Sequence, residues 1–412
     1  NLINQTGAIS VAANVSGTAS NLVFDTTTGT SASAITTGNF TFVTGSTSDI
    51  NLTVISKGSA LNPGTVGTSA LMLPGVLTLD NTNGGTVTAA NAISGIGVLL
   101  NRGAIYGGKG VVLKGVSNAN NAIYVSSAVT AANGDIVINA LGNSATTYSA
   151  PGAGGTLTAT NGSVSLTSVS TTGSAINIAS GSTITAKTGI TLNATSTTAA
   201  TVATVDVLTV TGAGANISFT GNASAAGALL GVDVGSINLS NGASLSLISN
   251  NKITQTGTIA NAANTNGAAS SILFDATSGT NASAVTIGTL TVAAVTSTSD
   301  INLLVKSKGS SITASGPLAT AAIPLPGTIV FDNTNGGVAT QATAVAGVGL
   351  TFNGGGVFGN KGITLTGVSN NNSAITSNQT MTSALGSVVL TGNTLTAGNL
   401  WGINATGTLT GK

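Results

Sequence analysis

The sequence predicts an all-β fold, and within that class an elongated parallel β-solenoid made of short stacked strands. Three observations support this prediction: the chain contains a long internal repeat, short alternating strands recur inside each copy, and helix-forming residues are scarce. The repeat is visible where TSDINLTVISKGS at 47–59 returns as TSDINLLVKSKGS at 298–310. We therefore divide the 412 residues into a first long repeat, 1–250, and a second, incomplete copy, 251–412, within one continuous solenoid.

The composition excludes several classes of protein. Only 5% of the residues are charged, against about 25% in ordinary soluble domains, and the chain has neither His nor Cys. Thiol chemistry and the usual zinc sites are therefore excluded. Ten cations spread over 412 residues do not form a surface that follows a phosphate backbone, so we expect no nucleic acid partner. The sequence has no apolar run long enough to span a bilayer as a helix, so we expect no membrane insertion of this segment.

A shorter rhythm inside each copy gives the coils of the solenoid. The segments share a small first residue and then alternate polar with apolar residues, as in GDIVINA at 134, GSVSLTS at 162, GITLNAT at 189, ANISFTG at 215 and GSINLSN at 235. From the spacing of their starts we predict coils of roughly 20–28 residues. Stacked about 4.8 Å apart, about 16 such coils would form a rod roughly 75–80 Å long.

Turn-forming residues mark the expected corners between strands. The DNTNGG segments at 80–85 and 332–337 are predicted corners, each preceded by a proline, Pro74 or Pro326. Aspartates in the SD-I-N and FD-x-T contexts are expected to cap turns through Asx-type hydrogen bonds.

Two glycine-rich segments approximate nucleotide-binding loops but lack their context. The segment from Gly103 to Gly110 has Gly110 where a magnesium-binding Ser or Thr belongs, and a strand-like VVLKGV follows it. Gly354, Gly356 and Gly359 spell GxGxxG, again without a following helix. The calcium-binding nonapeptide of β-rolls is also absent. We therefore expect no cofactor-binding and no metal-binding residues.

Stacking of coils offers the one route to paired carboxylates. Asp25 could lie near Asp49, and Asp275 near Asp300, because both separations approximate one coil. A pair of this kind would suit a polysaccharide-cleaving β-helix, but neither pair has a His, Glu or Arg to tune its pKa. We expect no catalytic residues and a chain that is not an enzyme.

Threonine arrays raise a third possibility, an ice-binding solenoid. Thr-x-Thr recurs in TLTAT at 156–160 and VLTVT at 207–211. An ice-binding face needs threonine at one fixed position in every coil, whereas here the position is expected to change from coil to coil.

The run of GDIVINA, GSVSLTS, SAINIAS, GITLNAT and GSVVLTG resembles the repeats of filamentous-haemagglutinin-type large exoproteins and giant autotransporter adhesins of Gram-negative bacteria. This resemblance implies a right-handed β-helix that is exported and displays an adhesive or matrix-forming surface outside the cell. It carries over no catalytic residues. The N-terminal secretion module of the family is not visible in this sequence.

From these observations we expect a structural or adhesive repeat region of a secreted or surface-displayed bacterial fibre or matrix protein. Neither end of the sequence shows a charged or proline-rich cap, which predicts self-association, head-to-tail or lateral, or continuation in a longer chain. A surface glycan or a host or cell receptor is the expected ligand. The alternatives are a polysaccharide-binding or polysaccharide-cleaving β-helix and, less favoured, an ice-binding solenoid.

Overall fold

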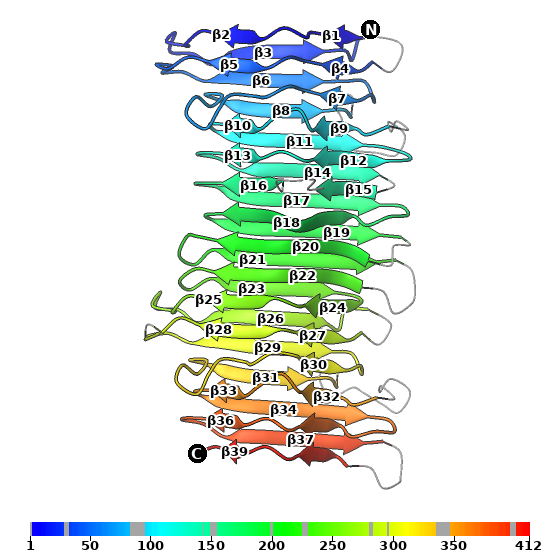
Figure 1. Cartoon of the computed structure of the whole chain (residues 1–412), viewed down its shortest axis with the longest axis vertical. Helices are drawn as coiled ribbons and strands as arrows, with labels where there is room; N and C mark the ends of the chain where they lie inside the picture. The colour runs from blue at the N-terminus through cyan, green and yellow to red at the C-terminus, as the bar shows by residue number, and fades with distance from the viewer. Residues whose placement is uncertain are drawn as a thin grey trace. The chain divides into compact units, whose positions relative to one another are not determined.

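The computed structural model describes residues 2–28, 33–82, 95–142, 144–148, 155–197, 201–224, 230–279, 283–294, 296–334, 347–395 and 401–412. The chain divides into two compact units, Asn1–Asp206 and Val207–Lys412. Both consist of parallel strands stacked in successive coils, and the described residues contain no helix (Figure 1). The predicted all-β parallel β-solenoid is therefore confirmed. The unit boundary falls inside strand β20 (Thr201–Val210) and does not coincide with the boundary of the sequence repeat at residue 250.

In unit 1 strands of 5 to 8 residues form one face of the coils, which we call the long face. They stack in parallel in the order β3 (Ser20–Asp25), β6 (Ile50–Ile55), β8 (Val76–Asp80), β11 (Gly110–Val116), β14 (Ile136–Gly142), β17 (Ser163–Ser170) and β19 (Gly189–Ser196). Alternation of the sequence decides which side chains enter the core. In β6, Ile50, Leu52 and Val54 are buried, while the residues between them are half-exposed.

Shorter strands build the other two faces of unit 1. One column contains β1 (Ile3–Asn4), β4 (Ile35–Thr36), β7 (Leu61–Asn62), β9 (Val98–Leu100), β12 (Asn121–Val125) and β15 (Ser144–Tyr148). The other contains β2 (Ile9–Val11) with β5 (Phe40–Phe42), and β10 (Ile105–Gly107), β13 (Val129–Ala131) and β16 (Thr156–Ala159). Strand β18 (Ile176–Ala186) is long enough to pair with both β15 and β16.

Unit 2 has the same three-faced coils. Its long strands are β21 (Asn216–Ala223), β23 (Ser244–Ser249), β26 (Ser270–Ala276), β29 (Ile301–Ser307), β31 (Thr328–Asp332), β34 (Gly362–Ser369) and β37 (Val388–Thr394). The first short column is β22 (Leu230–Leu239), β24 (Lys252–Gln255), β27 (Val285–Ile287), β30 (Ile312–Ala314), β32 (Leu350–Phe352), β35 (Ile375–Ser377) and β38 (Ile403–Ala405). The second is β25 (Thr258–Asn261) with β28 (Thr289–Val292), and β33 (Val357–Gly359), β36 (Met381–Ser383) and β39 (Leu409–Thr410).

Several coils are longer than predicted. On the long face of unit 1, the step from Leu52 to Leu77 has the predicted length, whereas the step from Val76 to Gly110 exceeds it. In unit 2 the step from Leu303 to Ile329 is short and the step from Thr328 to Gly362 is long, in the same order. The second copy of the repeat therefore keeps the order of short and long coils found in the first.

One of the segments used for that prediction was assigned to the wrong face. GSINLSN at 235–241 does not follow ANISFTG on the same sheet, because β21 pairs with β23, where Asn216 lies opposite Ser244. Ile237 instead lies in β22 on a short face, opposite Ile259. Every strand in a coil has the same alternation, so the pattern alone does not tell one face from another.

The core consists of apolar columns that run through successive coils. In unit 1 one such column is Leu52, Leu77, Val111, Ile136, Val164 and Ile190, all fully buried. In unit 2 the equivalent interior admits aromatic rings. Phe219, Phe274 and Phe331 are fully buried, and Phe331 packs edge-on against Phe352 with ring centres 5.0 Å apart. The narrow core therefore accommodates phenylalanine, although the sequence uses it sparingly.

Candidate functional site

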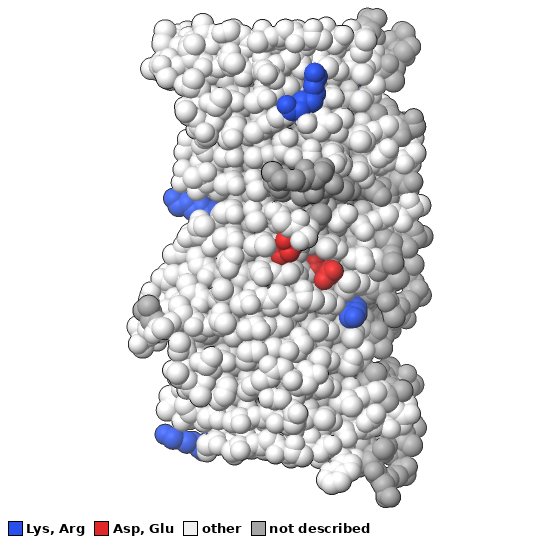
Figure 2. Space-filling model, viewed as in Figure 1, with Lys and Arg blue, Asp and Glu red and all other residues white. Residues whose placement is uncertain are grey.

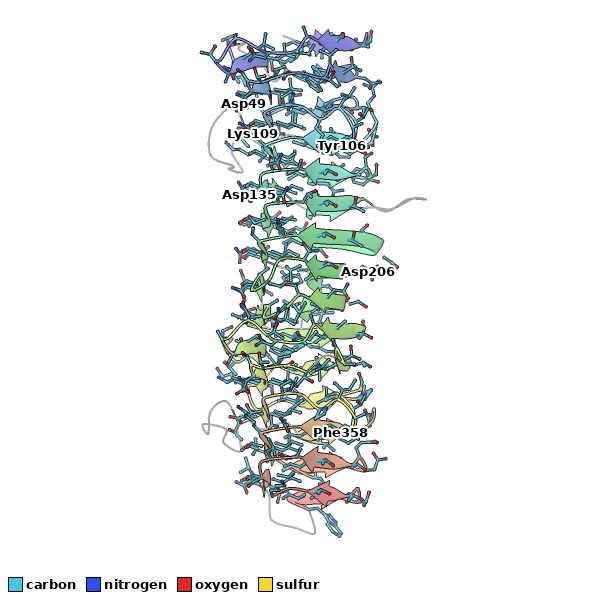
Figure 3. All side chains as sticks on the ribbon, turned by 90° about the vertical axis from the view of Figure 1, so that its left-hand side faces the viewer. Asp49, Tyr106, Lys109, Asp135, Asp206 and Phe358 are labelled. Carbon is cyan, nitrogen blue, oxygen red and sulfur yellow. The ribbon has the colours of Figure 1, made fainter. Side chains whose placement is uncertain are left out.

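Two ion pairs occupy matching positions in the two copies of the repeat. Lys109 Nζ lies 2.7 Å from Asp49 Oδ1, and Lys361 Nζ lies 2.7 Å from Asp300 Oδ1. Both carboxylates are about one-third exposed, whereas both lysines are more than half exposed. Figure 3 shows Asp49 and Lys109 at the same edge of unit 1. Because charged residues are so scarce, a duplicated ion pair is the strongest candidate for a feature that the repeat maintains.

Each ion pair joins coils that are not neighbours. Asp49 directly precedes β6, and Lys109 directly precedes β11, so the coil of β8 lies between them. At this point the intervening coil carries Gly75, whose carbonyl accepts a hydrogen bond of 3.0 Å from the Lys109 N–H. A Cβ atom at Gly75 would lie 2.4 Å from Asn51 Oδ1 and 2.6 Å from the Ile50 carbonyl oxygen. Glycine therefore lets the coils pack closely where the lysine crosses.

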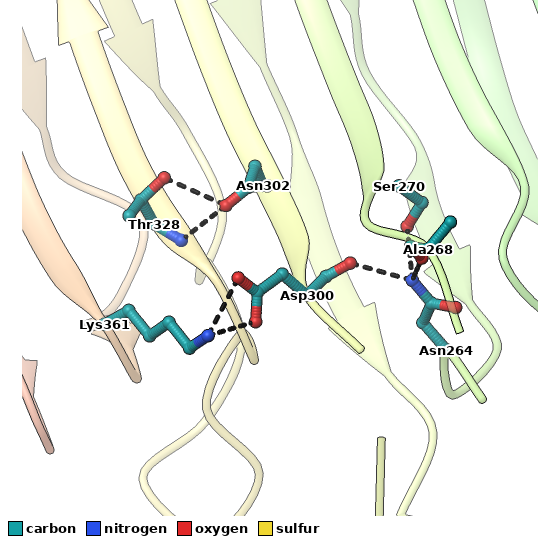
Figure 4. A network of polar contacts seen from close by, with 7 residues as sticks. All are labelled: Asn264, Ala268, Ser270, Asp300, Asn302, Thr328 and Lys361. Atoms are coloured by element: carbon teal, nitrogen blue, oxygen red, sulfur yellow. Dashed lines mark hydrogen bonds and ion pairs between the residues drawn. The ribbon is translucent and has the colours of Figure 1, made fainter. Parts of the chain in front are cut away.

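The second copy repeats this crossing with its own residues. The Lys361 N–H donates to the Gly327 carbonyl at 3.0 Å, and a Cβ at Gly327 would lie 2.4 Å from Asn302 Oδ1. Asn302 Oδ1 accepts hydrogen bonds of 3.0 Å from both the N–H and the hydroxyl of Thr328 (Figure 4). The asparagine of the SD-I-N motif thus links its coil to the next one, while the aspartate reaches the coil after that.

A buried asparagine completes the network on the other side of the aspartate. Asn14 Nδ2 donates to the carbonyls of Thr18 and Asp49, each at 2.8 Å. Asn264 makes the equivalent bonds to Ala268 at 2.9 Å and Asp300 at 2.8 Å (Figure 4). We call the set of Asn264, Asp300, Asn302, Gly327 and Lys361, together with its first-copy counterpart, the coil clamp. No such role was expected for Asn14 or Lys109 from the sequence, although the duplicated AAN and KG segments were a signal that could have found them.

The aspartates of the FD-x-T segments cap turns as predicted. Asp25 Oδ1 accepts a hydrogen bond of 2.7 Å from the Thr27 N–H, and Asp275 accepts the equivalent bond from Thr277 at 2.9 Å. The hydroxyl and N–H of Thr27 hold the pKa of Asp25 below its ordinary value. The prediction was wrong for the SD-I-N aspartates, Asp49 and Asp300, because their side chains bind lysine rather than the following turn.

The DNTNGG segments form corners through their first three residues. Asp80 Oδ1 accepts hydrogen bonds from the Thr82 N–H at 2.7 Å and hydroxyl at 2.5 Å. The buried Asn81 accepts from the Val116 N–H at 2.7 Å and donates to the Val116 carbonyl at 3.1 Å. Asn333 makes the same two bonds to Val368: it accepts from the Val368 N–H at 2.7 Å and donates to the Val368 carbonyl at 2.9 Å. The last three residues of each segment lie outside the described residues.

The carboxylate pairs considered for catalysis do not form. Asp25 ends β3 and lies opposite Ile55, whereas Asp49 precedes the first residue of β6, at the other end of the strand. Asp275 lies opposite Lys306, far along β29 from Asp300. Within the ranges described above, no three acidic side chains gather in a way that could hold a metal ion. The coil clamp pairs one carboxylate with one ammonium group, an arrangement that ties coils together.

The glycine-rich segments are parts of the coil wall. Residues Ile105–Gly107 form β10, the strand β11 begins at Gly110, and the side chain of Lys109 is held by Asp49. Gly359 closes β33 in the second copy. Neither segment leads into a helix, so neither has the helix N-terminus that a phosphate-binding loop needs.

The expectation about threonine was wrong for one face of unit 2. The outward positions of β24, β27, β30, β32 and β35 form a single column of threonines, Thr254, Thr286, Thr313, Thr351 and Thr376. Successive members are unevenly spaced in the sequence, because the loops between them differ in length, and this irregularity hides the column.

Among the described residues, no helix has the length and apolar character needed to cross a membrane. The chain matches no protein family model, no curated protein and no solved structure.

Proposed function

We propose that this chain is a structural or adhesive repeat region of a secreted or surface-displayed bacterial fibre or matrix protein, and that it acts without catalysis. The observation that carries the proposal is what the two copies of the repeat hold in common. They share the order of short and long coils. They also share the corner aspartates and asparagines and the coil clamp, whose contacts hold coils in register. A repeat maintained for these contacts is expected of a scaffold.

The composition supports the same role on physical grounds. A solenoid adds length by adding coils, because most contacts of each coil are with its neighbours. Faces rich in Thr, Ser and Asn supply many weak hydrogen-bonding groups for lateral association, and strand edges can pair with another chain. The resemblance to exported adhesin repeats is consistent with an extracellular location and with self-association, head-to-tail or lateral. A cleaving β-helix is disfavoured by the separation of Asp25 from Asp49 and of Asp275 from Asp300.

Electron microscopy of the natively purified protein tests this proposal. The strands stack in about 13 turns instead of the roughly 16 expected, so the coils of one chain account for roughly 60 Å at about 4.8 Å per turn. We expect rods or fibres much longer than this. A reducing-sugar assay on a panel of polysaccharides should remain at background. Discrete particles no longer than one chain, together with release of reducing ends, would overturn the structural role and favour the enzyme.

A further inference from the structure

One face of unit 2 carries a regular array of hydrogen-bonding side chains. Its first column is the five-threonine column defined above, in which neighbours lie opposite one another on adjacent strands and therefore about 4.8 Å apart. Beyond Thr376 the column continues into Asn404. From Thr286 to Thr376, each threonine stands between two inward-facing residues, so these side chains point away from the core.

A second column of polar residues runs beside the first. Asn353, Asn378 and Thr406 each lie two positions further along the chain from a member of the first column, and all three are exposed. The two columns line a groove that extends over three coils, from Thr351 and Asn353 to Asn404 and Thr406. Phe352 and Ser377 also contribute to its lining. The groove therefore follows the direction in which the coils stack.

Most of these polar groups have no partner within the protein. Two of the described side chains that line the groove make hydrogen bonds: the Ser377 hydroxyl accepts from the Gln379 N–H at 3.1 Å, and Asn378 Oδ1 accepts from the Gln379 side chain. The hydroxyls of Thr351 and Thr376 and the amide of Asn404 make none within the described part of the chain. They are available to a ligand, and both hydroxyl and amide groups can donate as well as accept.

The groove is also uncharged. Figure 2 shows this face of unit 2, and no Lys, Arg or Asp side chain lies over β27, β30, β32 or β35. The charged residues nearest along the column are Lys252 in β24 and Asp233, which lies opposite Thr254. Thr254 itself is three coils before Thr351. A charged ligand would therefore find no counter-ion in the groove.

We propose that this groove binds an extended, uncharged polysaccharide chain that lies along the stacking direction. Sugar hydroxyls on both edges of such a chain match the two columns of hydroxyl and amide groups, and successive coils repeat the contact. This inference rests on the adhesive part of the proposed function and names its ligand class. A concave groove suits a chain-like ligand, whereas an ordered water lattice requires a flat face.

The first copy of the repeat supplies a built-in comparison. Leu99 and Tyr124 lie opposite one another there, in the positions that Thr351 and Thr376 occupy in the second copy. The coils tolerate either pair, so the scaffold does not require threonine here. Binding is therefore expected in unit 2, and replacement by the residues of the first copy should remove it without unfolding the coils.

The test is affinity electrophoresis of the full chain in native gels that contain hydroxyethyl cellulose, galactomannan or dextran. We expect at least one neutral polymer to retard the wild type, and the double variant T351L/T376Y to weaken that binding at least tenfold. N353A/N378A should weaken it as well. The control is T364V on the long face, which introduces the residue that the first copy has there, Val112, and should bind like wild type. Circular dichroism melting checks that every variant is folded.

Several outcomes would overturn the inference. Retardation by polygalacturonate or heparin that equals or exceeds retardation by the neutral polymers would indicate a charged ligand. Thermal hysteresis that T351L/T376Y abolishes would indicate an ordered-water surface, and a dimer that the same variant dissociates would indicate a second copy of this chain. Absence of retardation by all three neutral polymers would also refute it. In that case, fibres seen by electron microscopy would still support the structural role. Failure of the polysaccharide-binding inference is therefore distinguishable from failure of the proposed function.

Discussion

Lys361 crosses a complete coil to reach Asp300, and the coil that it crosses has glycine at that position. The two residues are 61 positions apart, yet Nζ and the carboxylate oxygens are separated by 2.7 and 2.9 Å. Gly327 lies in between and hydrogen-bonds to the backbone of Lys361. The same relationship joins Lys109, Gly75 and Asp49 in the first copy. A contact of this kind couples three coils, whereas the ladder hydrogen bonds couple only two.

Removing the lysine should weaken each unit by a small, measurable amount. K361M is expected to lower the free energy of unfolding by about 0.2–1 kcal/mol, because the pair is partly exposed and water screens it. The loss from K109M should add to it, since the two sites are in separate units and share no residue. Urea unfolding followed by circular dichroism measures both effects, which should shrink at high salt concentration.

The matched control for this experiment is K187M. Lys187 Nζ donates only to the exposed Asn161 Oδ1, at 3.0 Å, and forms no ion pair within the described residues. Its removal should leave stability and salt dependence unchanged. If K361M and K187M behave alike, the ion pair of the coil clamp contributes nothing to stability.

The glycine beneath the lysine should be more sensitive than the lysine itself. In G75A the new methyl group would lie 2.4 Å from Asn51 Oδ1, so the neighbouring strands must move apart. Overpacking of this kind typically costs about 1–3 kcal/mol, and we expect G327A to cost a similar amount. G347A is the control, because a Cβ there meets no atom within 4 Å. Equal melting temperatures for G75A and G347A would show that the coils do not need this close approach.

The corner asparagines should be among the most costly residues to replace. Asn81 is buried and satisfies both the N–H and the carbonyl of Val116, so N81A leaves two backbone groups without partners. A loss of about 1–3 kcal/mol is expected, and N333A should behave alike through Val368. Hydrogen exchange of the Val116 amide should accelerate in N81A but not in N101A, which alters an exposed asparagine. Unchanged protection of the Val116 amide from hydrogen exchange in N81A would contradict the assigned hydrogen bonds between Asn81 and Val116.

The repeat and the alternation of apolar residues were sufficient to predict the solenoid, because both patterns can be recognised in the sequence without knowing which residues are in contact. The turn-capping role of Asp25 and Asp275 was predictable for the same reason, since their partners are two positions away. The coil clamp was not predictable in this way. Its charged groups are far apart in the sequence, and they meet only because two coil lengths happen to sum to that separation.

Variable coil length explains why the sequence did not reveal the threonine column. Coil length varies along the long face, from the short step between Leu52 and Leu77 to the long step between Val76 and Gly110. Positions that stack in space therefore have no fixed spacing in sequence, which hid the threonine column of unit 2. The error at Ile237 has another cause, because strands on every face have the same alternation and the sequence does not distinguish the faces.

The lysine next to the corner aspartate occupies different strands in the two copies of the repeat. Asp80 pairs with Lys114 at 3.2 Å on the following coil. Its counterpart Asp332 faces Thr366 on the following coil and has Lys306 opposite it on the preceding one. The lysine has thus changed coil while the corner aspartate has stayed, so the capping role of the aspartate does not depend on a particular cation.

Two aspartates should give opposite pH dependence. Partial burial raises the pKa of Asp233 above its ordinary value of 3.8, and the charge of Lys252 only partly offsets this effect. As pH rises through the interval between 3.8 and the raised pKa, the unfolded carboxyl ionises first, so the folded state loses stability. D233N should therefore stabilise the protein at neutral pH, and its advantage should disappear below pH 3.8, where the carboxyl is protonated in both states.

Asp25 is the matched comparison, because hydrogen bonds from Thr27 lower its pKa. Its stabilising contribution is present above 3.8 and is lost as pH falls through the lowered folded-state pKa. D25N should therefore destabilise the protein at neutral pH, and this effect should shrink as pH falls towards about 2. Urea unfolding of both variants and the wild type between these limits measures the two slopes. The same sign of change for D25N and D233N at neutral pH would refute the assignment of burial at Asp233 and hydrogen bonding at Asp25 as the dominant causes.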